Sequence, residues 1–69
     1  MIKYLIVIEK ADGNYSAFCP DLPGCIATGT TKREVEKNIR AAVTFHLEGL
    51  KQEGSLPEPH ALEAKYVQV

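Results

Sequence analysis

The feature that most constrains the fold is a single apolar stripe of helical period in the second half of the chain. Its members recur every three or four residues, which places them on one side of an α-helix. They are Val35, Ile39, Ala42, Val43, His46, Leu47 and Leu50. Thr31 with Glu34 predicts a capping box, in which two side chains satisfy two free backbone N–H groups, and Gly54 is typical of a helix end. The sequence therefore predicts one long amphipathic helix packed on another layer.

Four other segments have the composition or the alternation of β-strands: residues 2–9, 14–19, 25–29 and 61–69. The pair Asp12-Gly13 separates the first two segments and predicts a hairpin. A proline-rich turn separates the second and third, since proline cannot continue a ladder of hydrogen bonds. The order β-β-β-α-β predicts a two-layer α+β sandwich in one domain, residues 1–69, with the last strand parallel to the first.

The first predicted strand is apolar on both faces, with Leu5 and Val7 opposite to Ile6 and Ile8. Because one helix covers only one face of a sheet, Leu5, Val7 and their neighbours would remain exposed. A chain of 69 residues also buries a small core, and two cysteines are too few for a disulfide framework. We therefore expect a homo-oligomer, most simply a dimer.

The composition excludes several classes of protein. Hydrophobic residues make up 45% of the chain, and 8 basic residues stand against 9 acidic ones, for a net charge of −1. This is too apolar for intrinsic disorder, and no stretch resembles a membrane span or a secretory signal, so we expect a cytoplasmic protein with no membrane association. A near-neutral chain is also poorly suited to binding the phosphates of nucleic acids.

Residue types that carry chemistry are few. Cys19 and Cys25 do not have the Cys-x-x-Cys spacing of zinc or thioredoxin-like sites, and we interpret them as small buried side chains. We interpret His46, in the helical stripe, as a half-buried helix residue and His60, in a proline-rich turn, as a surface residue; neither has further ligands at metal-binding spacing. We predict no metal, no cofactor and no catalytic residue.

One enzymatic alternative stays open, a minimal metal-dependent ribonuclease that uses Glu9 or Asp21 with a helix carboxylate. Nucleases of this kind place several inward carboxylates on central strands beside a helix. Here the interior of the first strand is apolar and Glu9 stands at its end. We therefore favour the interpretation that these carboxylates lie on solvated faces.

The turn Pro20-Asp21-Leu22-Pro23-Gly24 is expected to be structural first and a partner contact second. Its prolines fix φ, its glycine can supply a positive φ, and a rigid turn loses little entropy on association. Leu22 at the apex is predicted to be an exposed apolar anchor, and Asp21 either to meet a basic partner or to cap the turn. The predicted partner-binding residues are Phe18, Pro20, Asp21, Leu22 and Pro23. The predicted structural residues are Gly24, Cys25, Gly29, Thr31 and Glu34.

The string Tyr-Ser-Ala-Phe-Cys-Pro-Asp-Leu-Pro-Gly-Cys at residues 15–25, followed by Thr28-Gly29-Thr30-Thr31, resembles the HicB-like antitoxin family. The apolar opening, the Asp-Gly hairpin and the Pro-Glu-Pro after the helix are also similar, so the resemblance covers nearly the whole chain. It implies a truncated ribonuclease H-like fold. It also implies a protein that binds and neutralises a small RNA-cleaving toxin with a double-stranded-RNA-binding-domain-like fold.

The resemblance gives expectations for partners as well. The toxin would be a small, basic HicA-like protein. Many members of the family continue into a C-terminal DNA-binding domain, whereas this chain stops at Val69, so we expect no DNA binding by this chain alone. The alternative is a solitary oligomeric domain that binds another protein and has no toxin partner.

Overall fold

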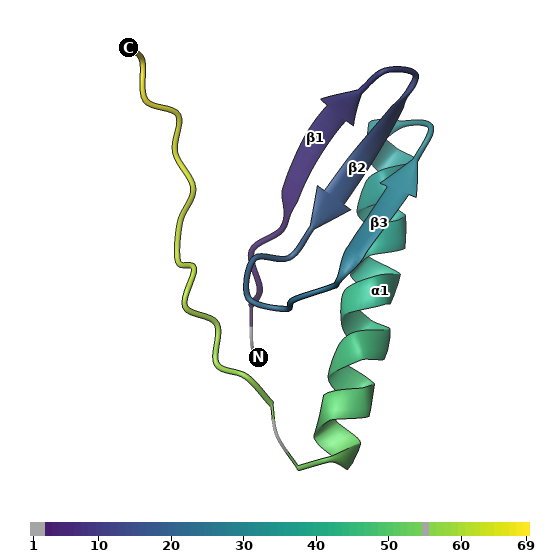
Figure 1. Cartoon of the computed structure of the whole chain (residues 1–69), viewed down its shortest axis with the longest axis vertical. Helices are drawn as coiled ribbons and strands as arrows, with labels where there is room; N and C mark the ends of the chain where they lie inside the picture. The colour runs from purple at the N-terminus through teal and green to yellow at the C-terminus, as the bar shows by residue number, and fades with distance from the viewer. Residues whose placement is uncertain (1–2, 55) are drawn as a thin grey trace.

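The computed structural model describes residues 3–54 and 56–69 and has two layers, an antiparallel sheet and one helix (Figure 1). The strands are β1 (Val7–Ala11), β2 (Asn14–Phe18) and β3 (Ile26–Gly29), in the order β1-β2-β3, and the helix is α1 (Lys32–Gln52). The α+β class is thereby confirmed, and the ribonuclease H-like assignment stays a prediction. Within the described residues, no helix is long and apolar enough to cross a membrane.

β1 is shorter than the predicted strand 2–9 and lies later in the chain. The Asp-Gly turn sets this register, because Ala11 pairs with Asn14 directly beside it and the ladder continues to Val7 opposite Phe18. Residues 3–6 have no strand partner because β2 ends at Phe18, and Ile2 lies outside the described residues. Gly13 has a φ of 78°, the conformation that a two-residue hairpin turn requires.

The first turn of α1 has the expected cap with one difference. Thr31 is the N-cap residue, and its hydroxyl accepts a hydrogen bond of 3.0 Å from the backbone N–H of Glu34. The Glu34 carboxylate accepts from the backbone N–H of Thr30 at 2.9 Å, not from that of Thr31 as a capping box predicts. The carboxylate therefore fixes the residue before the cap, which ties the end of β3 to the start of the helix.

Gly29 and Gly54 mark the two ends of the helical region. A Cβ atom at Gly29 would lie 2.5 Å from the backbone nitrogen of Val35, so only glycine allows β3 to approach α1 this closely. At the other end, Gly54 has a φ of 77° and donates its N–H to the carbonyl of Lys51 at 3.0 Å. The predicted helix and its end are confirmed.

The core lies between the sheet and α1. The buried residues are Ala17, Cys19, Leu22, Cys25, Val35 and Ile39. The rest of the predicted stripe, from Ala42 to Leu50, is half-buried, and its apolar members pack against this cluster. The predicted burial of both cysteines is confirmed, and burial together with the neighbouring Cys19 raises the pKa of the Cys25 thiol.

The predicted fourth strand, residues 61–69, is wrong. Residues 56–69 have no secondary structure, and Figure 1 shows the segment after α1 on the β1 side of the molecule, outside the sheet. The described order is therefore β-β-β-α. Alternation of side chains predicts that a segment can form a strand, but a strand exists only where a second edge supplies its hydrogen bonds.

Candidate functional site

The sheet face opposite α1 carries a row of apolar side chains. Ile8 packs against the core, so alternation places its neighbours in β1 on the opposite face. On that face Val7 pairs with Phe18, and Phe18 pairs with Ile26, so one residue from each strand forms a continuous line. We call Val7, Phe18 and Ile26 the apolar row. Val7 and Phe18 are half-buried, and the side chain of Ile26 is 69% exposed.

A polar row lies beside the apolar row on the same face. Glu9 pairs with Ser16, and Ser16 pairs with Thr28. The face is therefore divided into a polar end, near the β1–β2 hairpin, and an apolar end, near the β2–β3 turn. The expectation that α1 leaves one sheet face without a covering helix agrees with this arrangement.

The β2–β3 turn borders the apolar row, because Phe18 precedes it and Ile26 follows it. Three backbone hydrogen bonds of 3.1 Å hold it: Cys19 N–H to Cys25 O, Leu22 N–H to Cys19 O, and Cys25 N–H to Leu22 O. Pro20 and Pro23 are exposed at its surface, and Gly24 has a φ of 81°. The predicted structural role of the turn, with a glycine at positive φ, agrees with these bonds.

The prediction that Leu22 is an exposed anchor is wrong. Its side chain is 1% exposed and belongs to the buried core. The cause lies in the hydrogen bonds of the turn, which fold residue 22 back toward Cys19 and Cys25 and direct its side chain inward. Leu22 therefore attaches the turn to the core and offers no surface to a partner.

Asp21 binds the C-terminal segment of the chain. One carboxylate oxygen accepts from the backbone N–H of His60 and the other from that of Ala61, each at 3.1 Å. The side chain does not cap its own turn, which was one of its two predicted roles. Sequence reasoning missed this contact because 39 and 40 residues separate the partners and no local pattern connects them.

The residues of the nuclease alternative do not converge. Glu9 belongs to the sheet face opposite α1, so the helix carboxylates lie on the far side of the sheet from it. Both carboxylate oxygens of Asp21 already accept backbone hydrogen bonds. Within residues 3–54 and 56–69, no three His, Cys, Asp or Glu side chains form a group that could hold a metal ion. His46 is half-buried in α1 and His60 is exposed, as predicted.

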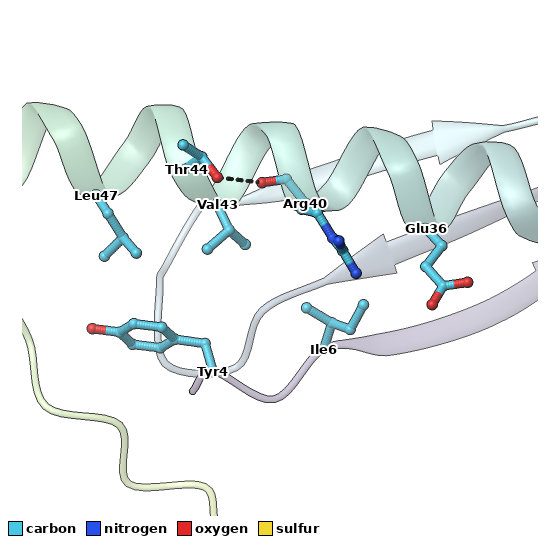
Figure 2. Close-up of a pocket in the computed structure, with 7 residues that line it drawn as sticks. All are labelled: Tyr4, Ile6, Glu36, Arg40, Val43, Thr44 and Leu47. Carbon is cyan, nitrogen blue, oxygen red and sulfur yellow. Dashed lines mark hydrogen bonds between the residues drawn. The ribbon is translucent and has the colours of Figure 1, made fainter. Parts of the chain in front are cut away.

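A groove of about 520 Å³ lies between residues 4–6 and the flank of α1. Figure 2 shows Tyr4 and Ile6 on one side, with Val43 and Leu47 of α1 directed toward them. Its remaining lining residues are polar: Glu36, Arg40 and Thr44. The groove lies beside β1, at the edge of the sheet where the fourth strand was predicted, and no pattern in the sequence indicated it.

Comparison with known proteins connects this arrangement with a described family. A sequence model of the family "HicB_like antitoxin of bacterial toxin-antitoxin system" matches residues 4–68. A 14.9 kDa protein from the rep-hol intergenic region of Haemophilus phage HP1 is 39% identical over 61 residues, which cover 87% of this chain and 46% of the relative. A UPF0150 protein of Thermoplasma acidophilum is 39% identical over 64 residues, which cover 90% of this chain and 93% of the relative.

A UPF0150 protein of Synechocystis is 44% identical over 48 residues, which cover 68% of this chain and 61% of the relative. The chain thus spans about half the length of the phage relative and nearly all of the archaeal one. No solved structure matches the chain significantly.

Proposed function

The chain belongs to the HicB-like antitoxin family of bacterial toxin–antitoxin systems, and we propose that it neutralises a small RNA-cleaving toxin by covering the active surface of that toxin. The proposed toxin is a basic, HicA-like protein. The observation that supports the proposal is the apolar row on the sheet face that α1 leaves uncovered. Contiguous apolar surface on a small protein marks a site of association.

Charge supports a basic partner. A toxin that binds RNA must be basic, and this chain has a net charge of −1. Glu9 lies on the same sheet face as the apolar row, two residues from Val7. A basic surface that docks on the apolar row would therefore meet a carboxylate at the margin of the contact, which favours association and orients it.

The proposed contact residues follow from their positions. Phe18 lies in the middle of the apolar row, and Pro20 and Pro23 are exposed beside it. Asp21 lies at the margin, where its carboxylate orders residues 60 and 61. Leu22 supports the site from the core side by fixing the turn and makes no contact itself.

The remaining parts of the proposal concern chemistry and assembly. We propose no catalytic activity, because Glu9 and the helix carboxylates lie on opposite sides of the sheet. We propose no DNA binding by residues 1–69, because basic and acidic residues balance. An antitoxin must meet its toxin where RNA is present, so we expect the protein in the cytoplasm. The assembly that we expect is a homodimer.

A solitary oligomeric interaction domain is the second candidate. The exposed apolar side chains of the C-terminal segment favour it, since they indicate self-association that needs no toxin. The two candidates differ in one observation, the presence of a neighbouring reading frame for a small basic protein.

Titration calorimetry with a purified small, basic, HicA-like toxin tests the proposed contact. Ile26→Ala removes an apolar side chain that is 69% exposed, so the fold should remain stable while the contact weakens. Burying such a side chain contributes about 1.5 to 3 kcal/mol, so Kd should rise by about ten- to a hundredfold.

Thr28→Ala is the matched control. Thr28 is also exposed, belongs to the same strand and lies on the same face in the polar row. Its Kd should stay close to that of the wild type. Equal Kd values for wild type and Ile26→Ala would contradict the proposed site and move the toxin-binding surface elsewhere.

A further inference from the structure

The C-terminal segment has the side chains of a buried strand but lies in solvent. Leu62, Tyr66 and Val67 are each at least 80% exposed. Alternation places Leu62, Ala64 and Tyr66 on one side of the segment and Lys65 with Val67 on the other. Exposed apolar side chains in this pattern indicate that the segment can join the edge of a sheet as an additional strand.

The outer edge of β1 is a suitable acceptor. The sheet order is β1-β2-β3, so within the described residues no strand pairs with β1 on the side away from β2. The backbone N–H and C=O groups of such an edge bind a further strand readily. The edge and the exposed segment are therefore complementary in their backbone groups.

The groove beside that edge matches one side of the segment. Tyr4, Ile6, Val43 and Leu47 form its apolar part, next to the position that an added strand would occupy (Figure 2). Every second side chain of that strand would point toward α1, so Leu62 and Tyr66 can enter the groove together. A buried tyrosine hydroxyl needs a hydrogen-bond partner, and the polar residues that line the groove supply several.

The other side of the segment matches the uncovered sheet face. Lys65 and Val67 would lie beside β1 on the face that carries Val7 and Glu9. This places an ammonium group and an apolar side chain on the face that carries both a carboxylate and the apolar row. Cross-strand pairs of both kinds stabilise sheets.

We propose that two copies of this chain exchange residues 62–69, so that each segment forms a fourth strand on the β1 edge of the other copy, with Leu62 and Tyr66 in the partner's groove. Bonds at the start of the segment fix the point at which it leaves its own chain. The Tyr4 hydroxyl donates to the carbonyl of Pro57, and Asp21 accepts from His60 and Ala61. Beyond these anchors the segment leaves its own sheet (Figure 1).

Length and symmetry support the same arrangement. Residues 62–69 span up to about 26 Å when extended, which is enough to reach an adjacent molecule. A second copy presents the same edge and the same groove, so the exchange is reciprocal and closes as a two-fold dimer. Both segments and both edges are then used, and no strand edge beside β1 remains free.

Isotope-filtered NMR on the full chain tests the exchange directly. Isotope-labelled and unlabelled chains are mixed, unfolded and refolded together. Nuclear Overhauser effects are then measured between protons of a labelled chain and protons of an unlabelled chain. We expect contacts between Leu62 or Tyr66 of one chain and Val43 or Leu47 of the other. Contacts only within one chain would show that the segment closes on its own sheet, and no contacts would show that it stays free; either result overturns the proposal.

Two variants test the same contact by mass in solution. Leu62→Glu places a charge on the side of the segment that faces the groove and should raise the dimer Kd by at least about tenfold. Gln52→Glu introduces the same charge at an exposed residue at the end of α1, outside the segment, and should leave the dimer intact. Circular dichroism should show the same helix content in both. A dimer of unchanged strength in Leu62→Glu would refute the exchange, and since no toxin is present the outcome is independent of toxin binding.

Discussion

Replacing Leu22 with alanine should destabilise the protein strongly, although Leu22 lies in a turn. Its side chain is 1% exposed and is one of the largest fully buried side chains in the described core. Leucine-to-alanine changes at such sites cost about 2 to 5 kcal/mol. A domain of this length has a total stability of about 3 to 10 kcal/mol, so the variant should lose a large fraction of it.

Urea unfolding followed by circular dichroism measures this cost, and thermal unfolding provides a second reading. For a domain of this size, a loss of about 2 kcal/mol lowers Tm by about 8 to 16 °C. Leu56→Ala is the matched control, because the same chemical change is made at a side chain that is 44% exposed. Its effect should be clearly smaller. Equal stability of wild type and Leu22→Ala would refute the argument that Leu22 attaches the turn to the core.

Three further changes have expected outcomes. Gly29→Ala would place a Cβ 2.5 Å from the backbone nitrogen of Val35, so β3 and α1 would have to move apart. This shift should lower the free energy of unfolding in urea by about 1 to 3 kcal/mol. An unchanged unfolding midpoint would argue against the close approach. Asp21→Asn removes a charge-assisted bond, so amide exchange at Ala61 should speed up by about tenfold while Tm changes little; unchanged exchange would contradict the anchoring role. Because burial raises the pKa of the Cys25 thiol in the folded state, the folded chain binds more protons than the unfolded chain between the two pKa values. The free energy of unfolding should therefore fall as pH rises above about 8.5, and Cys25→Ala should flatten this slope.

Local signals in the sequence predicted the elements that local bonds stabilise. The Thr31 hydroxyl caps α1 by accepting from a backbone N–H only three residues away. Asp12 and Gly13 form the hairpin turn between Ala11 and Asn14, which pair directly with each other. In such elements the sequence pattern and the stabilising contact involve the same few residues. The helix, the hairpin and the burial of the two cysteines were accordingly predictable.

Contacts that the local sequence pattern does not specify account for the predictions that were wrong. The position of Leu22 depends on how three backbone bonds fold the turn onto the core, and proline, aspartate and glycine around it are also typical of exposed turns. The contacts of Asp21 with His60 and Ala61 connect residues that lie 39 and 40 positions apart. Alternation at residues 61–69 describes the segment itself and does not specify which edge, or which molecule, supplies its partner.

The most direct test of the proposed function is an RNA-cleavage assay with a purified small, basic, HicA-like toxin. Cleavage of an RNA substrate is measured while the purified chain is added in increasing amounts. We predict that cleavage falls steadily and is abolished once the chain reaches molar equivalence, and that Ile26→Ala requires a larger amount than Thr28→Ala. Undiminished cleavage at a large excess of folded chain would contradict the account.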